Sequence, residues 1–378
     1  MTNRLLFVLI AFLVACTPQQ PSYYGPVQLA AGHRPGDLLD AQPFPGAPAG
    51  ATATRILYAS TALDGTPVPI SALVIIPDAP SASSRPVLAW LHPTTGVASA
   101  CAPTLGPTPF AQIQGLSLFL AAGYAIVATD YEGLGGPGTH PYLVGASEAR
   151  AALDSVRALQ RMPAAQAGPR FAVWGHSQGG HAALFTAALA PSYAPDLQLV
   201  GAAAAAPVTD MAALIERPAE NPLWGGLLAY TVWSWSRVFA ADPADIAPRA
   251  THVTIDRTAQ VCLETGDELK QLITDSAPLS GQPIHPGDRW RALLAENVTP
   301  PYSGPPTFIA QGEADPVIDP ALTRAFATDL CHHGIKLRYD SMPGVDHYTA
   351  AVKSAPTAAA WIADRFAGKP PPDDCANP

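Results

Sequence analysis

A serine flanked by glycines is the first group in this chain that could do covalent chemistry. Residues 175–179 read Gly-His-Ser-Gln-Gly, with each glycine two positions from Ser177. This spacing is typical of a nucleophilic serine on a tight strand-to-helix turn, where only glycine leaves room for the neighbouring backbone. An apolar run precedes the turn at 171–174, and an apolar helical stretch follows at 182–190. These flanks favour a nucleophile over an ordinary glycine-rich loop.

A serine hydroxyl needs a general base before it can attack a carbonyl carbon at neutral pH. Among the ten histidines, His347 follows a late strand-like run and precedes the terminal helical stretch. That is where chains of the α/β-hydrolase fold place the base, after the serine and the acid. His176 and His181 lie near Ser177 in sequence, but we expect both to project away from it. His347 is therefore the predicted base.

The base in turn needs a carboxylate that fixes its tautomer and stabilises its positive charge. Asp315 comes four residues after the strand-like run at 306–311, in the loop position that this role requires. Glu313 is the first alternative, and Asp319 and Asp346 are weaker ones. The predicted mechanism has the serine attacking an acyl carbon, the histidine carrying the proton, and Asp315 orienting the histidine.

Acyl transfer also requires two donors for the oxyanion that forms on the attacked carbonyl. One is the backbone N–H of the residue after the nucleophile, here Gln178. The other comes from the loop after the first buried strand, residues 92–96. Pro93 has no N–H to donate, which leaves Thr95 or Thr94 as the candidate.

Alternating strand-like and helical stretches position these residues. An antiparallel hairpin is predicted over 51–60 and 68–76, and the later elements follow in the order strand, helix, strand. The predicted strands are 87–91, 124–129, 171–174, 197–206, 306–311 and 335–339, and the predicted helices are 112–122, 146–160, 182–190, 320–331 and 349–366. This rhythm predicts an α/β fold of the α/β-hydrolase type, a mostly parallel central sheet with helices on both faces.

The alternation stops between 208 and 305, where helical stretches are rich in aromatic residues. We interpret this region as a helical cap, or lid, inserted over the site. The expected organisation is a signal peptide (1–16), a proline- and glycine-rich tether with an N-terminal wrap (17–50), the first part of the hydrolase core (51–207), the helical cap (208–305), and the second part of the core with the C-terminal tail (306–378).

Composition narrows the class of protein. The chain has 378 residues, of which 48% are hydrophobic and 13% charged, so it can bury a large core. Its formal net charge is −9 and it has no basic run, which argues against a nucleic-acid partner. No close cluster of cysteines and histidines suggests a metal site. We expect no metal, no cofactor and a monomeric state.

The N-terminus is typical of an export signal. Arg4 is followed by an apolar run at 5–14 that is too short to span a membrane. Residues 13–16, Leu-Val-Ala-Cys, resemble the lipobox of bacterial lipoproteins, in which the cysteine is acylated. We therefore expect an exported protein lipid-anchored to the cell envelope through Cys16, in the outer membrane if the source has two membranes. A simple cleavable signal peptide is the alternative.

Four further cysteines, Cys101, Cys262, Cys331 and Cys375, remain after Cys16 is set aside. An even number in an exported protein favours two disulfides. Sequence counting leaves all three possible pairings open.

Seven separated motifs occur together and in order. They are Trp-Leu-His-Pro-Thr-Thr-Gly (90–96), Cys-Ala-Pro (101–103), Asp-Tyr-Glu-Gly (130–133), the serine turn (175–179), Tyr-Ala-Pro (193–195), Gly-Glu-Ala-Asp (312–315) and Asp-His (346–347). In this combination the chain resembles the secretory lipase family, yeast lipase A-like α/β-hydrolases with a large helical lid, over about 36–366. The resemblance implies the triad Ser177, Asp315 and His347, the oxyanion donor Thr95, and the disulfides Cys101–Cys262 and Cys331–Cys375.

Residues and resemblance together predict a serine carboxylic-ester hydrolase, a carboxylesterase or lipase, that forms an acyl-enzyme intermediate. Its expected partners are an ester or lipid substrate and the membrane that holds the N-terminal anchor. Two alternatives stay open. One is a serine peptidase or amidase of the same fold, and the other is a catalytically inactive hydrolase-fold lipoprotein that binds a ligand.

Overall fold

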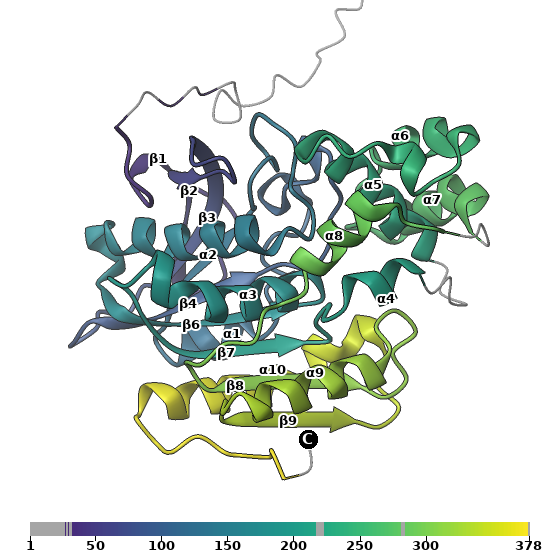
Figure 1. Cartoon of the computed structure of the whole chain (residues 1–378). Coiled ribbons are helices and arrows are strands. Elements are labelled where there is room, and N and C mark those ends of the chain that lie inside the picture. The colour runs from purple at the N-terminus through teal and green to yellow at the C-terminus, as the bar shows by residue number, and fades with distance from the viewer. Residues whose placement is uncertain (1–26, 28, 30–31, 217–222, 281–283, 377–378) are drawn as a thin grey trace, which may run out of the picture.

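A nine-stranded sheet forms the centre of the molecule (Figure 1). The structure, a computed structural model, describes residues 27, 29, 32–216, 223–280 and 284–376. The strands of the described chain run in the spatial order β1-β2-β3-β5-β4-β6-β7-β8-β9. Their bounds are β1 Leu38–Pro43, β2 Ala51–Thr61, β3 Pro67–Pro77, β4 Arg85–Leu91, β5 Ala125–Thr129, β6 Ala167–His176, β7 Gln198–Ala205, β8 Thr307–Gly312 and β9 Leu337–Met342.

The sheet changes character along its width. Strands β1, β2, β3 and β5 pair antiparallel to one another, whereas the pairs from β5 through β4, β6, β7 and β8 to β9 are parallel. The predicted mostly parallel sheet is confirmed. Strand β1 was not predicted as a separate strand and falls within the segment interpreted as a tether and wrap. Its residues are polar or exposed over most of its length, so it lacks the apolar run that marks a buried strand.

Helices cover both faces of the sheet. Helices α2 (Gly145–Gln160), α3 (Gln178–Tyr193) and α9 (Pro320–His332) pack with Val87, Ala89 and Leu91 on one face. Helices α1 (Leu116–Ala121) and α10 (His347–Phe366) pack with Leu88 and Trp90 on the other. Successive residues of β4 thus enter opposite cores, as the alternation of side chains along a strand requires. Because both faces are covered, the apolar runs of the central strands are buried throughout.

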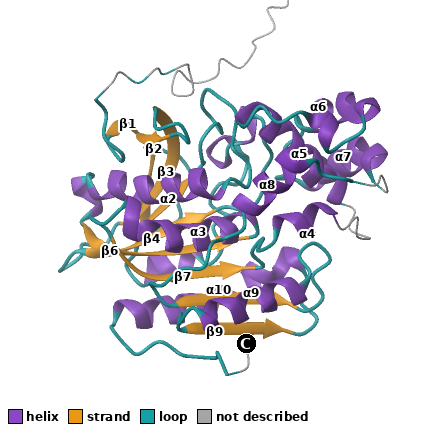
Figure 2. Cartoon of the chain, viewed as in Figure 1, coloured by secondary structure: helices purple, strands orange, loops and turns teal. Residues whose placement is uncertain are grey.

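A helical insertion lies between β7 and β8, and we use that name for the described residues from 206 to 306. It holds α4 (Met211–Glu216), α5 (Trp224–Val238), α6 (His252–Thr258), α7 (Gly266–Ser276) and α8 (Asp288–Glu296), with no strand in its described part (Figure 2). Trp224, Tyr230, Trp235 and Trp290 are buried in a hydrophobic cluster that the insertion shares with Tyr142 and neighbouring residues of the rest of the chain. In Figure 1 these helices gather beyond the arrowhead of β7, at the carboxyl edge of the sheet. No helix of the described chain is long and apolar enough to cross a membrane.

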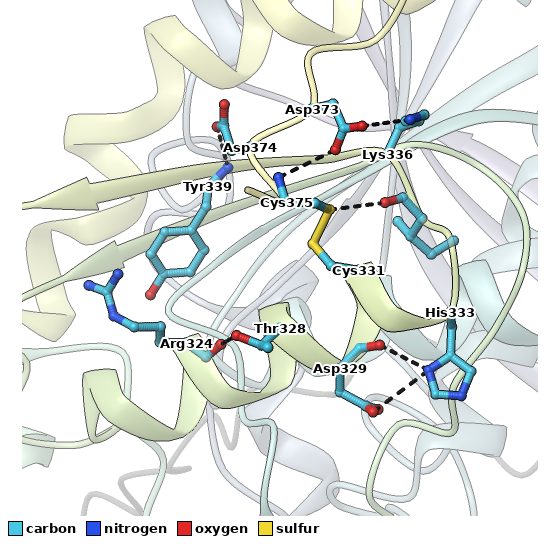
Figure 3. Close-up of a disulfide and its surroundings, with 11 residues drawn as sticks. Arg324, Thr328, Asp329, Cys331, His333, Lys336, Tyr339, Asp373, Asp374 and Cys375 are labelled. Atoms are coloured by element: carbon cyan, nitrogen blue, oxygen red, sulfur yellow. Dashed lines mark hydrogen bonds and ion pairs between the residues drawn. A yellow bond between two sulfur atoms is a disulfide. The ribbon is translucent and has the colours of Figure 1, made fainter. Parts of the chain in front are cut away.

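Two disulfides join distant parts of the chain. Cys101 is bonded to Cys262, and Cys331 is bonded to Cys375, as Figure 3 shows for the second pair. This is the pairing that the family resemblance implies. Cys16, the expected lipidation site, lies outside the described residues.

Several helix boundaries differ from the prediction, the largest shifts being at the starts of α1 and of α3, which begins at Gln178 and not at residue 182. Helix α1 begins at Leu116, four residues later than predicted, because Gly115 in the left-handed region precedes it. Helix α10 begins at His347 and not at residue 349, because Asp346 caps it by accepting a hydrogen bond from the Thr349 N–H.

Candidate active site

Ser177 lies on a strained turn between β6 and α3. Its φ of +56° and ψ of −116° fall in a region that a residue with a side chain rarely adopts. The flanking glycines explain how the turn fits. A Cβ on Gly175 would lie 2.0 Å from the Gly179 carbonyl oxygen, and one on Gly179 would lie 1.9 Å from the Leu91 carbonyl oxygen. The turn therefore requires glycine at both positions, as the sequence pattern predicts.

The three residues singled out as nucleophile, base and acid lie within hydrogen-bond distance of one another. His347 Nε2 is 2.9 Å from Ser177 Oγ, and His347 Nδ1 is 2.8 Å from Asp315 Oδ2. Because the carboxylate oxygen accepts, Nδ1 carries the proton and Nε2 offers a lone pair to the serine hydroxyl. All three side chains are buried. The arrangement can take a proton from the hydroxyl as the oxygen attacks a carbonyl carbon.

Asp315 is held by donors from its own loop and from strand β8. The N–H groups of Val317 and Ile318 each donate to Oδ1 at 2.8 Å, and Gln311 Nε2 donates to Oδ2 at 3.0 Å. Together with His347 these donors converge on one buried carboxylate. They fix the direction from which it meets the imidazole.

The alternative acids have other partners. Glu313 Oε1 accepts a hydrogen bond from Ser341 on the surface, at 2.8 Å. Asp319 and Asp346 cap α9 and α10 by accepting from the backbone N–H of Ala321 and Thr349. The carboxylate bonded to His347 is thus that of Asp315.

Two backbone segments were predicted to supply the oxyanion donors. Gln178 is the first residue of α3, so its N–H has no acceptor within the helix. The positive end of the helix dipole also lies next to Ser177. Thr94 lines the cleft next to Ser177, with its hydroxyl 2.8 Å from that of Tyr142. The Thr95 carbonyl accepts from the Leu263 N–H at 2.8 Å, and the buried Thr95 Oγ1 has no hydrogen-bond partner among the described residues.

The prediction that both neighbouring histidines project away from Ser177 is wrong for His176. Its ring centroid lies 5.1 Å from that of His347, and its Nε2 donates to the His347 carbonyl at 2.9 Å. Burial and the nearby His347 lower the pKa of His176 to about 3, so it stays neutral. The contact joins residues 171 positions apart in the sequence, so no local pattern indicates it. His181 does project elsewhere, toward Glu148 and Asn297.

Ser177 opens into a cleft of about 320 Å³. Core and helical insertion both contribute to its wall: Pro93, Thr94, Gln114, His176, Ser177, Leu223, Leu227, Leu263, Glu264, Thr265, Gly266, Leu269, Val317, His347 and Tyr348. A larger hollow of about 620 Å³ beside α4 touches Asp315 but neither Ser177 nor His347. We therefore assign the reactive groups to the smaller cleft.

Two acids have raised carboxyl pKa values: the buried Asp130, and Glu264, which is partly buried in the cleft wall. Burial raises the pKa of Asp130 to about 6, although hydrogen bonds from Ser71 and Thr104 act in the opposite direction. Burial, with Glu268 and Asp130 nearby, raises the pKa of Glu264 to about 7. Perturbed carboxyl groups of this kind gather at functional sites. Within the described chain, no group of His, Cys, Asp and Glu side chains is arranged to hold a metal ion.

Sequence reasoning missed one polar contact of the residue after Ser177. The Gln178 side chain donates to Glu148 on α2, 30 residues away in sequence. The three-residue spacing of Gln178 and His181 indicates only that they share one face of a helix, and both side chains reach Glu148.

Comparison with known proteins identifies the family. The family model described as Secretory lipase matches residues 109–269 and 291–374. A Mycobacterium tuberculosis protein named "Probable inactive lipase MT1628" is 28% identical over 346 residues, covering 84% of this chain and 74% of that protein. Lipase 9 of Candida albicans is 26% identical over 284 residues, covering 69% of this chain and only 60% of that protein.

Solved structures share the fold. The chain resembles Candida antarctica lipase A in its closed state with a TM-score of 0.74 and 20% identity, covering 92% of this chain and 85% of that one. It resembles the rice cell wall degrading esterase LipA of Xanthomonas oryzae with a TM-score of 0.67 and 18% identity, covering 88% and 98%. The fold is thus that of the α/β-hydrolases, as predicted.

Proposed function

The chain belongs to the secretory lipase family, and from this premise we propose that it is a serine carboxylic-ester hydrolase, an esterase or lipase, working through Ser177, His347 and Asp315. The observation that carries the proposal is the continuous chain of hydrogen bonds from Ser177 Oγ through His347 to Asp315. A serine, a base and an orienting acid in this geometry suit acyl transfer and require no cofactor.

The reaction would proceed in two halves. Ser177 Oγ attacks the ester carbonyl carbon while His347 Nε2 takes the hydroxyl proton. The tetrahedral intermediate then collapses, and the alcohol leaves with the proton that His347 returns. In the second half, water gives its proton to His347 as it attacks the acyl-enzyme. His347 then returns the proton to Ser177 Oγ as the carboxylic acid leaves. Asp315 stabilises the imidazolium in both halves.

The oxyanion of each intermediate would be bound by the Gln178 N–H and by a second donor from Thr95. Support for Gln178 is its place at the start of α3, where free N–H groups and the helix dipole favour negative charge. Support for Thr95 is its position in the loop after β4 and its buried, unpartnered hydroxyl.

The helical insertion would act as the cap that selects the substrate. Four leucines from it line the cleft: Leu223, Leu227, Leu263 and Leu269. An apolar wall of this kind suits an acyl chain. The proposed division of the chain is accordingly a hydrolase core at 51–207 and 306–378, with the cap at 208–305 between its two parts.

Location follows from the family and the disulfides, which suit an exported protein. We propose further that the lipobox-like Cys16 carries a lipid anchor, which would hold a monomeric enzyme on the cell envelope. Labelling with a radioactive fatty acid tests the anchor, since Cys16→Ala would lose the label if the proposal holds.

Hydrolysis of p-nitrophenyl acyl esters tests the catalytic proposal. Ser177→Ala should lose at least about 10⁴-fold in kcat. Ser192→Ala is the matched control, because Ser192 is exposed near the end of the same helix. Equal activity of the wild type and Ser177→Ala would overturn the proposal. Aminoacyl anilides in the same assay distinguish an amidase, which would cleave them faster than the esters.

The second candidate function is ligand binding by an inactive hydrolase fold. It is favoured by the 28%-identical relative, whose name describes an inactive lipase. A fluorophosphonate probe separates the two, because it reacts with an activated serine. An active enzyme would be labelled at Ser177, whereas a purified, folded protein that stays unlabelled would support the binding function.

A further inference from the structure

The Gln178 side chain points into the protein and joins a buried polar network. Gln178 is only 1% exposed. Its Nε2 donates to Glu148 Oε1 at 2.9 Å and lies 3.2 Å from His140 Nε2. His140 Nδ1 faces the Glu132 carbonyl at 2.8 Å, so Nδ1 donates there and Nε2 is free to accept from Gln178. Both hydrogens of the Gln178 amide therefore have acceptors.

Glu148 connects this side chain to a second residue of the same helix. Its Oε2 lies 2.7 Å from His181 Nδ1, and His181 Nε2 donates to the Asn297 carbonyl at 3.0 Å. Glu148 is 1% exposed and His181 is 0% exposed. A carboxylate this deeply buried is stable only when its oxygens are bonded, and here one oxygen holds each of two side chains of α3.

The network extends into the helical insertion through Asn297. This residue follows α8, and its Oδ1 accepts from the Gly145 N–H at the start of α2, at 3.1 Å. Its Nδ2 donates to the Leu293 carbonyl at 2.9 Å. One buried asparagine thus contacts the beginning of α2 and, through His181, the first turn of α3. Ser234 on α5 adds a second link, donating to the His140 carbonyl at 2.6 Å.

This network would control the orientation of the Gln178 backbone N–H. The N–H of residue 178 stabilises an oxyanion only if it is aimed before the charge develops, since reorientation during the reaction cancels the gain. A single glutamine rotamer bonded to a fixed carboxylate restricts the peptide that carries this N–H. Glu148 and the Gln178 amide are bonded to each other and to buried histidines, away from Ser177 Oγ. Their effect on catalysis would therefore be indirect.

We propose that Glu148 and the Gln178 side chain form a positioning pair that holds the oxyanion-binding N–H of Gln178, locked to the helical insertion through His181 and Asn297. The inference rests on the proposed ester hydrolysis. It adds to that function a physical link between the insertion and the site of negative charge.

Two substitutions of Glu148 distinguish positioning from simple structural support. In Glu148→Gln the new amide can accept from Gln178 through Oε1 and donate to a neutral His181 through Nε2, so every hydrogen bond survives. In Glu148→Leu both are lost at nearly constant volume. We expect kcat for p-nitrophenyl esters to fall about 10- to 100-fold in Glu148→Leu with KM nearly unchanged, and to stay within about twofold of wild type in Glu148→Gln.

The rate of inactivation by a phosphonate ester provides a second readout, because its phosphoryl oxygen occupies the oxyanion position. It should fall in parallel with kcat. Thr186→Val is the matched control, since it removes a buried hydrogen bond of α3, to the Ala182 carbonyl at 2.7 Å, outside the network. This control should change Tm but neither rate.

Gln178→Met covers the case in which Glu148→Leu does not fold. It leaves the Glu148–His181 contact intact and removes only the anchor of residue 178, so kcat should again fall with KM constant. The inference is overturned if a folded Gln178→Met or Glu148→Leu keeps wild-type kcat, or if Glu148→Gln loses as much as Glu148→Leu. The proposed function fails separately, if the wild type itself neither hydrolyses esters nor reacts with the phosphonate.

Discussion

The two disulfides lie in two regions whose charged side chains differ in burial. The cleft end, around Cys101–Cys262, contains the acids Asp130 and Glu264, whose carboxyl pKa values burial raises. The tail end, around Cys331–Cys375, has the ion pair Lys336–Asp373, whose side chains are 57% and 38% exposed (Figure 3). A disulfide alone therefore does not mark a site. The buried and perturbed charges that accompany it are the more informative sign.

The largest difference in kcat should appear between variants in which one aspartate is replaced by asparagine at the cleft end or at the tail end. Asp315→Asn should lower kcat about 10⁴-fold, because an amide at this position stabilises the wrong tautomer of His347. Asp374→Asn at the tail end is the matched control. Asp374 accepts from the Tyr339 N–H at 3.0 Å on the far strand of the sheet, so its loss should leave kcat unchanged. Steady-state hydrolysis of one ester measures both.

Removing each disulfide compares the two ends in stability and in activity. Cys101 and Cys262 are 161 residues apart and Cys331 and Cys375 are 44 apart. Loop-closure entropy then gives upper limits of about 5 and about 4 kcal/mol for their contributions to the free energy of unfolding. Paired Cys→Ser substitutions should thus destabilise both regions by similar amounts in a urea titration.

Activity should separate the two paired variants. The chain after Cys262 lines the cleft, and the Leu263 N–H donates to the Thr95 carbonyl. Loosening it should therefore displace a cleft wall and the loop of the proposed oxyanion donor. We expect kcat/KM to fall about tenfold in the Cys101/Cys262 variant and to stay constant in the Cys331/Cys375 variant. Equal losses in both would remove the functional distinction between the ends.

The sequence predicts those elements that carry a local signal. The elements around Ser177, Asp315 and His347 follow from short apolar runs and from the chain order of the fold, which are local signals. Strand β1 is mostly exposed and carries no such signal. The disulfide pairing came from the family resemblance, because counting cysteines left three possibilities.

Contacts between distant elements were beyond sequence reasoning. Glu148 is 30 residues from Gln178 and 33 from His181, and nothing in the spacing indicates which helix face meets which. His176 was misplaced for the same reason, since its partner His347 is 171 residues away in the sequence. The roles of the candidate residues stay predictions until the substitutions above are measured.

The dependence of stability on pH should differ in sign between the ends. Asp130 has a pKa of about 6 in the folded protein, above its unfolded value, so the folded state holds this proton more tightly. Protonated Asp130 contributes about 3 kcal/mol to the free energy of unfolding. This contribution is complete below about pH 4 and is lost as the pH rises through 6. Asp130→Asn should abolish this part of the slope of unfolding free energy against pH. An unchanged slope between pH 4 and 7 would contradict the assignment.

The smallest effect is expected at the exposed ion pair of the tail end. The Lys336 ammonium holds the pKa of Asp373 below its usual value, so this pair stabilises the fold above the unfolded pKa and its contribution is lost as the pH falls through the folded one. Lys336→Ala should lower Tm by only about 1 °C at pH 7, because exposed pairs are screened by water and salt. The difference from wild type should shrink at acidic pH, as Asp373 becomes protonated in both proteins. Calorimetry at pH 7 and at acidic pH measures it, and a large loss of Tm at pH 7 would mean that the tail end is coupled to the core as tightly as the cleft end.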